Sequence, residues 1–97
     1  MHVGVCRLMI HVPDASSLKE KRQVSRSLTD RIKNQFNVAV AEVEDNDLHR
    51  RLTLGIACVS NDSAHANEII SKVVAFVESS RRDIELLDYE LEIISGV

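Results

Sequence analysis

The chain has 97 residues, of which 44% are apolar and 28% charged, and its net charge is −3. This composition is typical of a globular protein and excludes a disordered chain, and the length leaves no room for a second core. We therefore expect a single domain over residues 1–97. The sequence shows no membrane span and no secretory signal, which predicts a cytoplasmic protein with its two cysteines reduced and buried.

Residues 1–12 alternate with period two, which predicts a strand. The odd positions make a mixed face, and Pro13 and Asp14 end the strand. One polar face indicates a sheet that is covered on one side only. The even positions form a continuous apolar face: Gly4, Cys6, Leu8, Ile10 and Val12.

A helix is predicted to begin after Ser17 and to run to Phe36. Ser17 and Glu20 fit a capping box, in which each side chain binds a free backbone N–H of the first turn. At 100° per residue, one arc of about 120° is apolar and the opposite side is cationic. The apolar arc holds Leu18, Val24, Leu28, Ile32 and Phe36, and the cationic side holds Lys19, Arg22, Arg26 and Lys33.

The remaining segments predict two further strands, a second helix and a fourth strand. Residues 37–44 and 52–59 are strand-like, and the polar segment 45–51 joins them. Asp62 is a good N-cap for the second helix. Residues 84–94 then form the last strand, in which one face is apolar and the other carries Asp88, Glu90 and Glu92. We expect the apolar face to consist of Leu87, Tyr89, Leu91 and Ile93.

The order of elements is therefore β-α-β-β-α-β. With right-handed crossovers, this order gives a ferredoxin-like α+β plait, with an antiparallel sheet in the order 4-1-3-2 and both helices on one face. The first and third strands would then be antiparallel neighbours at the centre of the sheet. Cys6 and Cys58 should consequently lie close together.

Several segments, in this order, resemble the YlxP-like family of small bacterial proteins, a domain of unknown function. The resemblance covers nearly the whole chain and is carried by residues 17–22, 31–38, 40–43, 54–55 and 59–62. It implies a ferredoxin-like fold, which agrees with the pattern of elements. It also implies work on the ribosome or RNA, since genes of the family tend to lie beside those for transcription elongation, translation initiation and ribosome maturation. At His49, relatives usually have an aromatic residue, often Trp.

Charge is distributed unevenly along the chain. Residues 16–36 hold six bases and two acids, a net +4, so the rest carries −7, and residues 83–97 hold five acids and no base. A basic helix face can bind phosphates, and Ser16, Ser17 and the free N–H groups at the start of the helix could hold one more phosphate. A solvated helix face is the alternative interpretation. The candidate nucleic-acid-binding residues are Lys19, Lys21, Arg22, Arg26, Arg31 and Lys33.

The open face of the sheet offers a second candidate surface. It lacks the exposed aromatic residues on which RNA-binding plaits stack bases. Val3, Val5 and Met9 would leave apolar surface there that a second copy of the chain could cover. The alternative is a merely amphipathic sheet, in which Arg7 pairs with Glu90 or Glu92 across the strands.

The sequence indicates no catalytic residues, no cofactor site and no metal site. It has no glycine-rich phosphate loop, and its cysteines and histidines lack metal-ligand spacing. The acidic segment of Glu42, Glu44, Asp45 and Asp47 is interpreted as an exposed turn that Arg50 and Arg51 partly neutralise. The sequence therefore predicts a non-enzymatic accessory protein that binds the ribosome or structured RNA. The alternative is a homo-oligomeric protein-interaction or regulatory domain that uses the open sheet face.

Overall fold

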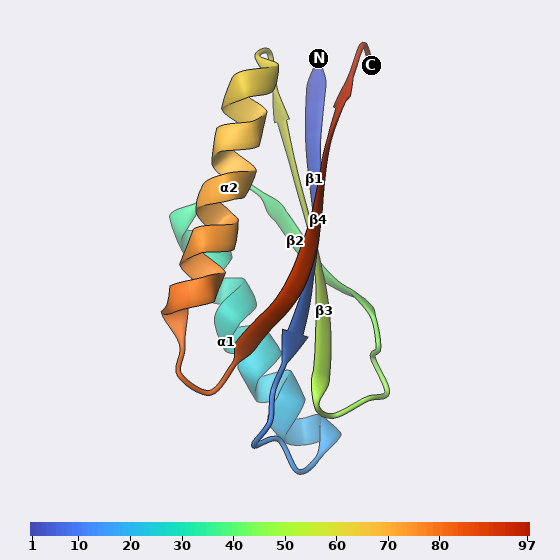
Figure 1. Cartoon of the computed structure of the whole chain (residues 1–97), viewed down its shortest axis with the longest axis vertical. Coiled ribbons are helices and arrows are strands. Elements are labelled where there is room, and N and C mark those ends of the chain that lie inside the picture. The colour runs from blue at the N-terminus through green and yellow to red at the C-terminus, as the bar shows by residue number, and fades with distance from the viewer.

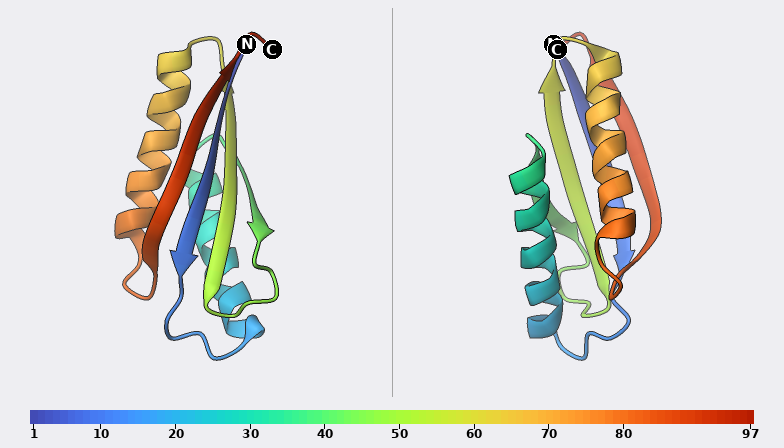
Figure 2. Two further views of the ribbon diagram at one scale, coloured as in Figure 1. Left: turned by 45° about the vertical axis from the view of Figure 1, so that its right-hand side comes forward. Right: turned by 90° about the vertical axis from the view of Figure 1, so that its left-hand side faces the viewer.

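The computed structural model describes all residues 1–97 and confirms the ferredoxin-like α+β plait. Its antiparallel sheet has the order β2-β3-β1-β4, which is the expected 4-1-3-2 read from the other edge. Both helices lie on one side of this sheet, and the other side is left open (Figures 1 and 2). The elements are β1 (His2–His11), α1 (Leu18–Gln35), β2 (Ala39–Glu44), β3 (Arg51–Ser60), α2 (Ser63–Ser80) and β4 (Glu85–Ser95).

The core lies between the two helices and the central strands β1 and β3. α2 packs on β1, β3 and β4, while α1 packs on β2. The two helices meet where the rings of Phe36 and Phe76 contact edge to face, with their centroids 5.6 Å apart. Neither helix is long and apolar enough to cross a membrane. β1 buries its even-numbered residues in this core, as the period-two pattern predicted: Cys6, Leu8 and Ile10. β3 buries Leu52, Leu54, Ile56 and Cys58 there as well.

Both helices begin at the predicted caps. The hydroxyl of Ser17 accepts the backbone N–H of Glu20 at 3.2 Å, and a carboxylate oxygen of Asp62 accepts the N–H of Ala64 at 3.1 Å. The second half of the predicted capping box differs. The carboxylate of Glu20 binds Ser16, the residue before the cap, instead of the backbone N–H of Ser17.

A β-bulge in β4 changes which of its residues face the core. Met9 of β1 pairs with Asp88, but the next residue, Ile10, pairs with Leu86, so Leu87 is an extra residue in the ladder. Leu86 therefore packs against the core and Leu87 is exposed, contrary to the predicted alternation. Tyr89 lies opposite the buried Leu8 and so faces the helix side as predicted, but it is 47% exposed.

The two cysteines are neighbours, as expected. Cys58 pairs with Gly4 and Cys6 pairs with Ile56, so the thiols lie diagonally across β1 and β3 on the buried side of the sheet. Both are free thiols. Burial raises the pKa of the Cys6 thiol to about 11, because a thiolate would be poorly solvated there. Cys6 is therefore an unreactive core thiol, and Cys58 is buried beside it.

Candidate functional site

The outer face of α1 carries four exposed cations. Lys19, Arg22, Arg26 and Lys33 point away from the sheet, and none of them forms an ion pair within the chain. Along the helix axis, the row from Lys19 to Lys33 is about 21 Å long at 1.5 Å per residue. We call these four residues the cationic stripe.

The acidic β4 does not cover the cationic stripe. α1 packs on β2, at one edge of the sheet, whereas β4 forms the opposite edge. Figure 2 shows this separation in its right-hand view, in which α1 and the red β4 lie at opposite sides of the molecule. The stripe is therefore open to solvent along its length.

Arg31, another of the predicted nucleic-acid-binding residues, is partly engaged by α2. Its guanidinium donates to the backbone carbonyl of Ser80 at 3.1 Å and lies 5.3 Å from the centre of the Phe76 ring. These contacts hold Arg31 against the second helix. It remains exposed, but part of its hydrogen-bonding capacity is already used.

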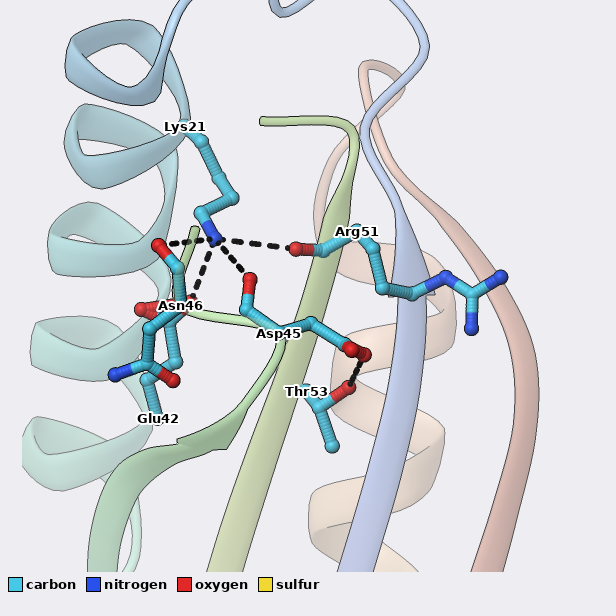
Figure 3. Close-up of polar contacts among 6 residues, drawn as sticks. All are labelled: Lys21, Glu42, Asp45, Asn46, Arg51 and Thr53. Carbon is cyan, nitrogen blue, oxygen red and sulfur yellow. Dashed lines mark hydrogen bonds and ion pairs between the residues drawn. The ribbon is translucent and has the colours of Figure 1, made fainter. Parts of the chain in front are cut away.

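Lys21 does not belong to the cationic surface, and this part of the prediction needs correction. Its side chain has 0% exposure, although it was predicted to bind nucleic acid. Its ammonium donates to the carbonyl oxygens of Asp45 (2.8 Å), Asn46 (3.3 Å) and Arg51 (3.2 Å) (Figure 3). It also pairs with the carboxylate of Glu42 at 3.1 Å. Because these groups enclose the ammonium, Lys21 cannot contact a phosphate.

The contacts of Lys21 fix the loop that joins β2 to β3. Asp45 has a positive φ of 60°, which a non-glycine residue seldom adopts. Its carboxylate accepts the hydroxyl of buried Thr53 at 2.8 Å, and its carbonyl accepts the N–H of Leu48 at 3.0 Å. Hydrogen bonds from Lys21 and Thr53 thus hold the loop in place. Leu48 and His49 are exposed on it.

The carboxylate of Glu20 lies at the start of α1, where the sequence predicted an additional phosphate. The carboxylate of Glu20 accepts the backbone N–H of Ser16 at 2.7 Å and the Ser16 hydroxyl at 2.9 Å. These two hydrogen bonds hold the pKa of Glu20 below its usual range. A phosphate would have to displace this negative charge, which the predicted anion site did not take into account.

The acidic segment before the β2–β3 loop is neutralised by residues other than those predicted. Glu42 pairs with Lys21, and Glu44 pairs with Arg7 at 3.3 Å. Arg50 instead donates to the carbonyl of Ala15 at 3.4 Å. The carboxylates therefore point to different partners, and no group of three or more metal-ligating side chains comes together in the chain.

The open sheet face holds the predicted interface residues Val3, Val5 and Met9, all partly buried on β1. Arg7 lies among them, directly opposite Glu90 in the register. Its guanidinium nevertheless pairs with Glu44 of β2, not with Glu90 or Glu92 as the amphipathic alternative supposed. Gly55 lies between Arg7 and β2 in the sheet, opposite Arg7 on one side and Ala41 on the other.

Beside Arg7 the open face is hollowed, which was not predicted from the sequence. The hollow has a volume of about 820 Å³. Its floor consists of small residues that pair across β2 and β3, namely Ala39 with Ala57 and Ala41 with Gly55. Small residues at alternate positions of two neighbouring strands were the signal in the sequence. Glu90 and Glu92 line the hollow on the side of β4.

Comparison with known proteins identifies the family. Residues 3–91 match the family described as "Protein of unknown function (DUF503)". The chain belongs to the DUF503 family. Over 74 residues it is also 38% identical to a relative named "Uncharacterized protein YlxP" from Bacillus subtilis (strain 168), covering 76% of this chain and 78% of that protein. This membership confirms the resemblance to the YlxP-like family.

Proposed function

We propose that the protein is a non-enzymatic RNA-binding accessory protein that contacts ribosomal or other structured RNA through the cationic stripe of α1. One observation carries this proposal: four cations share one exposed helix face and have no carboxylate partner in the chain. Neighbouring cations without counter-ions attract a polyanion, and binding releases the counter-ions condensed on it.

The proposed contact reads the phosphate backbone and not the bases. The outward face of α1 carries no aromatic residue for stacking, and Lys and Arg contacts to phosphate fix position without selecting sequence. We therefore expect selection by the shape of a structured RNA. Arg31 would contribute less than the four residues of the stripe, because α2 already engages it. Lys21 would contribute no direct contact.

The test is a salt series of binding to ribosomal subunits and to a structured RNA. The variant Arg22→Glu with Arg26→Glu should weaken binding by about tenfold or more, and each lost phosphate contact should reduce the slope of log K against log salt by about 1. The matched control is Lys72→Glu, which reverses a charge on α2 that is already paired with Glu68. Absence of binding at low salt, or equal binding by both variants, would contradict the proposal.

A second candidate function is protein–protein interaction through the open sheet face. It is favoured by the hollow of about 820 Å³ on that face, next to the partly buried Val5. Homo-oligomerisation would be one form of it, with Val3, Val5 and Met9 in the interface. Light scattering over a range of concentrations tests that form, and a strict monomer at high concentration would exclude it. Self-association through apolar residues should survive salt that dissociates RNA.

A further inference from the structure

We propose that the hollow on the open sheet face binds a segment of another protein in which an apolar side chain is flanked by lysine or arginine. This proposal rests on the second candidate function, protein–protein interaction through the open sheet face, and specifies the chemical character of the partner. It is independent of the cationic stripe, which lies on a helix on the opposite side of the sheet.

The floor of the hollow explains why an apolar side chain fits. Ala39, Ala41, Gly55 and Ala57 leave space above β2 and β3, while Val5 and the exposed Val43 rise beside them. Val43 leans over Gly55, since a Cβ on that glycine would lie only 2.8 Å from Cγ1 of Val43. The hollow is thus shaped by apolar groups that water wets poorly. Burying an apolar side chain against them is favourable.

The charges that line the hollow explain why the flanking residues should be basic. Four charged side chains line it: Arg7, Glu44, Glu90 and Glu92. Arg7 and Glu44 form an ion pair at 3.3 Å, so their charges cancel. Glu90 and Glu92 have no ion-pair partner in the chain, which leaves a net charge of −2 at the rim. A lysine or arginine beside the inserted side chain would supply the missing counter-charges.

A second copy of this chain fits the hollow less well. Two open faces brought together would place the unpaired carboxylates of Glu90 and Glu92 in one interface with the acidic β4 of the other copy. The cationic stripe of a second copy has the opposite charge, but the exposed residues of α1 include no apolar side chain to insert. The same rim charge repels RNA. A basic, partly apolar segment of a different protein satisfies both features of the hollow.

The test is an NMR titration of the ¹⁵N-labelled full chain with a synthetic peptide in which one leucine is flanked by arginines on both sides. We expect shifts at the amides of Ala41, Gly55 and Ala57. Replacing the arginines of the peptide by glutamates, or its leucine by serine, should abolish them. In the protein, Ala57→Leu should weaken the affinity about tenfold by filling the floor, and Glu90→Gln with Glu92→Gln should weaken it similarly. The matched controls are Ile94→Ser, on the same face outside the hollow, and Glu78→Gln on α2; neither should change the affinity.

Each other outcome overturns the proposal in a distinct way. If the same amides shift with protein concentration alone and not with peptide, a second copy covers the hollow, so the occupant is wrong while the interaction function stands. Binding of the glutamate peptide as tightly as the arginine peptide would refute the role of the rim. If neither peptide nor concentration produces shifts there, both this proposal and the second candidate function fail, whereas RNA binding by α1 is unaffected.

Discussion

The ammonium nitrogen of Lys21 lies 3.1 Å from a carboxylate oxygen of Glu42, and Lys21 is completely enclosed between α1, β2 and the β2–β3 loop. Three backbone carbonyls complete the surroundings of the ammonium (Figure 3). This cluster joins the first helix to the hairpin of β2 and β3. Its basic residue is therefore structural, although it lies in the most basic segment of the chain.

Replacing Lys21 by Met should lower the free energy of unfolding by about 3–5 kcal/mol, because it leaves the carboxylate of Glu42 without its partner in a mostly buried position. Urea unfolding followed by circular dichroism measures this loss. The control is Lys19→Met on the exposed stripe, which should change stability by less than about 0.5 kcal/mol. Equal stabilities of the two variants would contradict the structural role of Lys21.

Gly4 and Gly55 should differ in their tolerance of a methyl group. A Cβ at Gly4 would lie 3.0 Å from Cγ1 of Ile70 and 3.1 Å from the sulfur of Cys58, both in the packed core. Gly4→Ala should therefore destabilise the protein by about 1–3 kcal/mol. Gly55→Ala meets only Val43, whose exposed side chain can turn away, and the loss should stay below about 1 kcal/mol. Thermal unfolding of the two variants compares their losses of stability. A larger loss for Gly55→Ala would contradict the prediction, because it would mean that the core near Gly4 relaxes to accept the methyl group.

The stability of the protein should fall in alkaline solution partly because of Cys6. Its thiol has a pKa of about 11 in the folded chain, against an ordinary value of 9.0, so the folded state holds the proton more tightly. The contribution is complete below about pH 9 and is lost as the pH rises towards 11, by up to about 2–3 kcal/mol. Unfolding curves at several pH values measure it. Cys6→Ala should show a shallower decline, and an identical decline in both proteins would refute this assignment.

Ser16 should control the titration of Glu20. The variant Ser16→Ala removes the hydroxyl hydrogen bond but keeps the backbone one, so the pKa of Glu20 should rise towards 4.5 and remain below it. Because that pKa is lowered by folding, the carboxylate stabilises the fold at neutral pH and the effect is lost as the pH falls below about 4.5. An NMR titration of the Glu20 carboxyl carbon follows the change, with Ser71→Ala on α2 as the control. No movement of the Glu20 pKa in Ser16→Ala would mean that its hydroxyl is not a significant partner.

Lys21 also shows where the prediction from sequence was incomplete. Its position at 100° per residue falls between those of Leu28 and Ile32, so the helical period itself places it in the buried arc. Charge alone suggested exposure, because an isolated ammonium is rarely buried. Only the loop, with its three carbonyls and Glu42, makes that position stable for a lysine.

Other differences arise from contacts between distant segments. The bulge at Leu87 depends on how β4 pairs with β1, and the pair of Arg7 with Glu44 joins two strands that β3 separates. The hollow requires two runs of small residues to lie side by side, with the unpaired Glu90 and Glu92 at its rim. None of these features follows from the local pattern of a single segment.

By itself the sequence determined the order of the elements, the strand faces of β1, both helix caps and the grouping of four cations on α1. These features depend on period, capping and turn chemistry over a few residues, which act within each segment. Only the tertiary structure decided which charges are free, which are enclosed, and where the open face is hollow. Those features depend on distances between side chains that are far apart in the chain. Packing of the whole fold sets these distances, and the periodicity within one segment does not determine them.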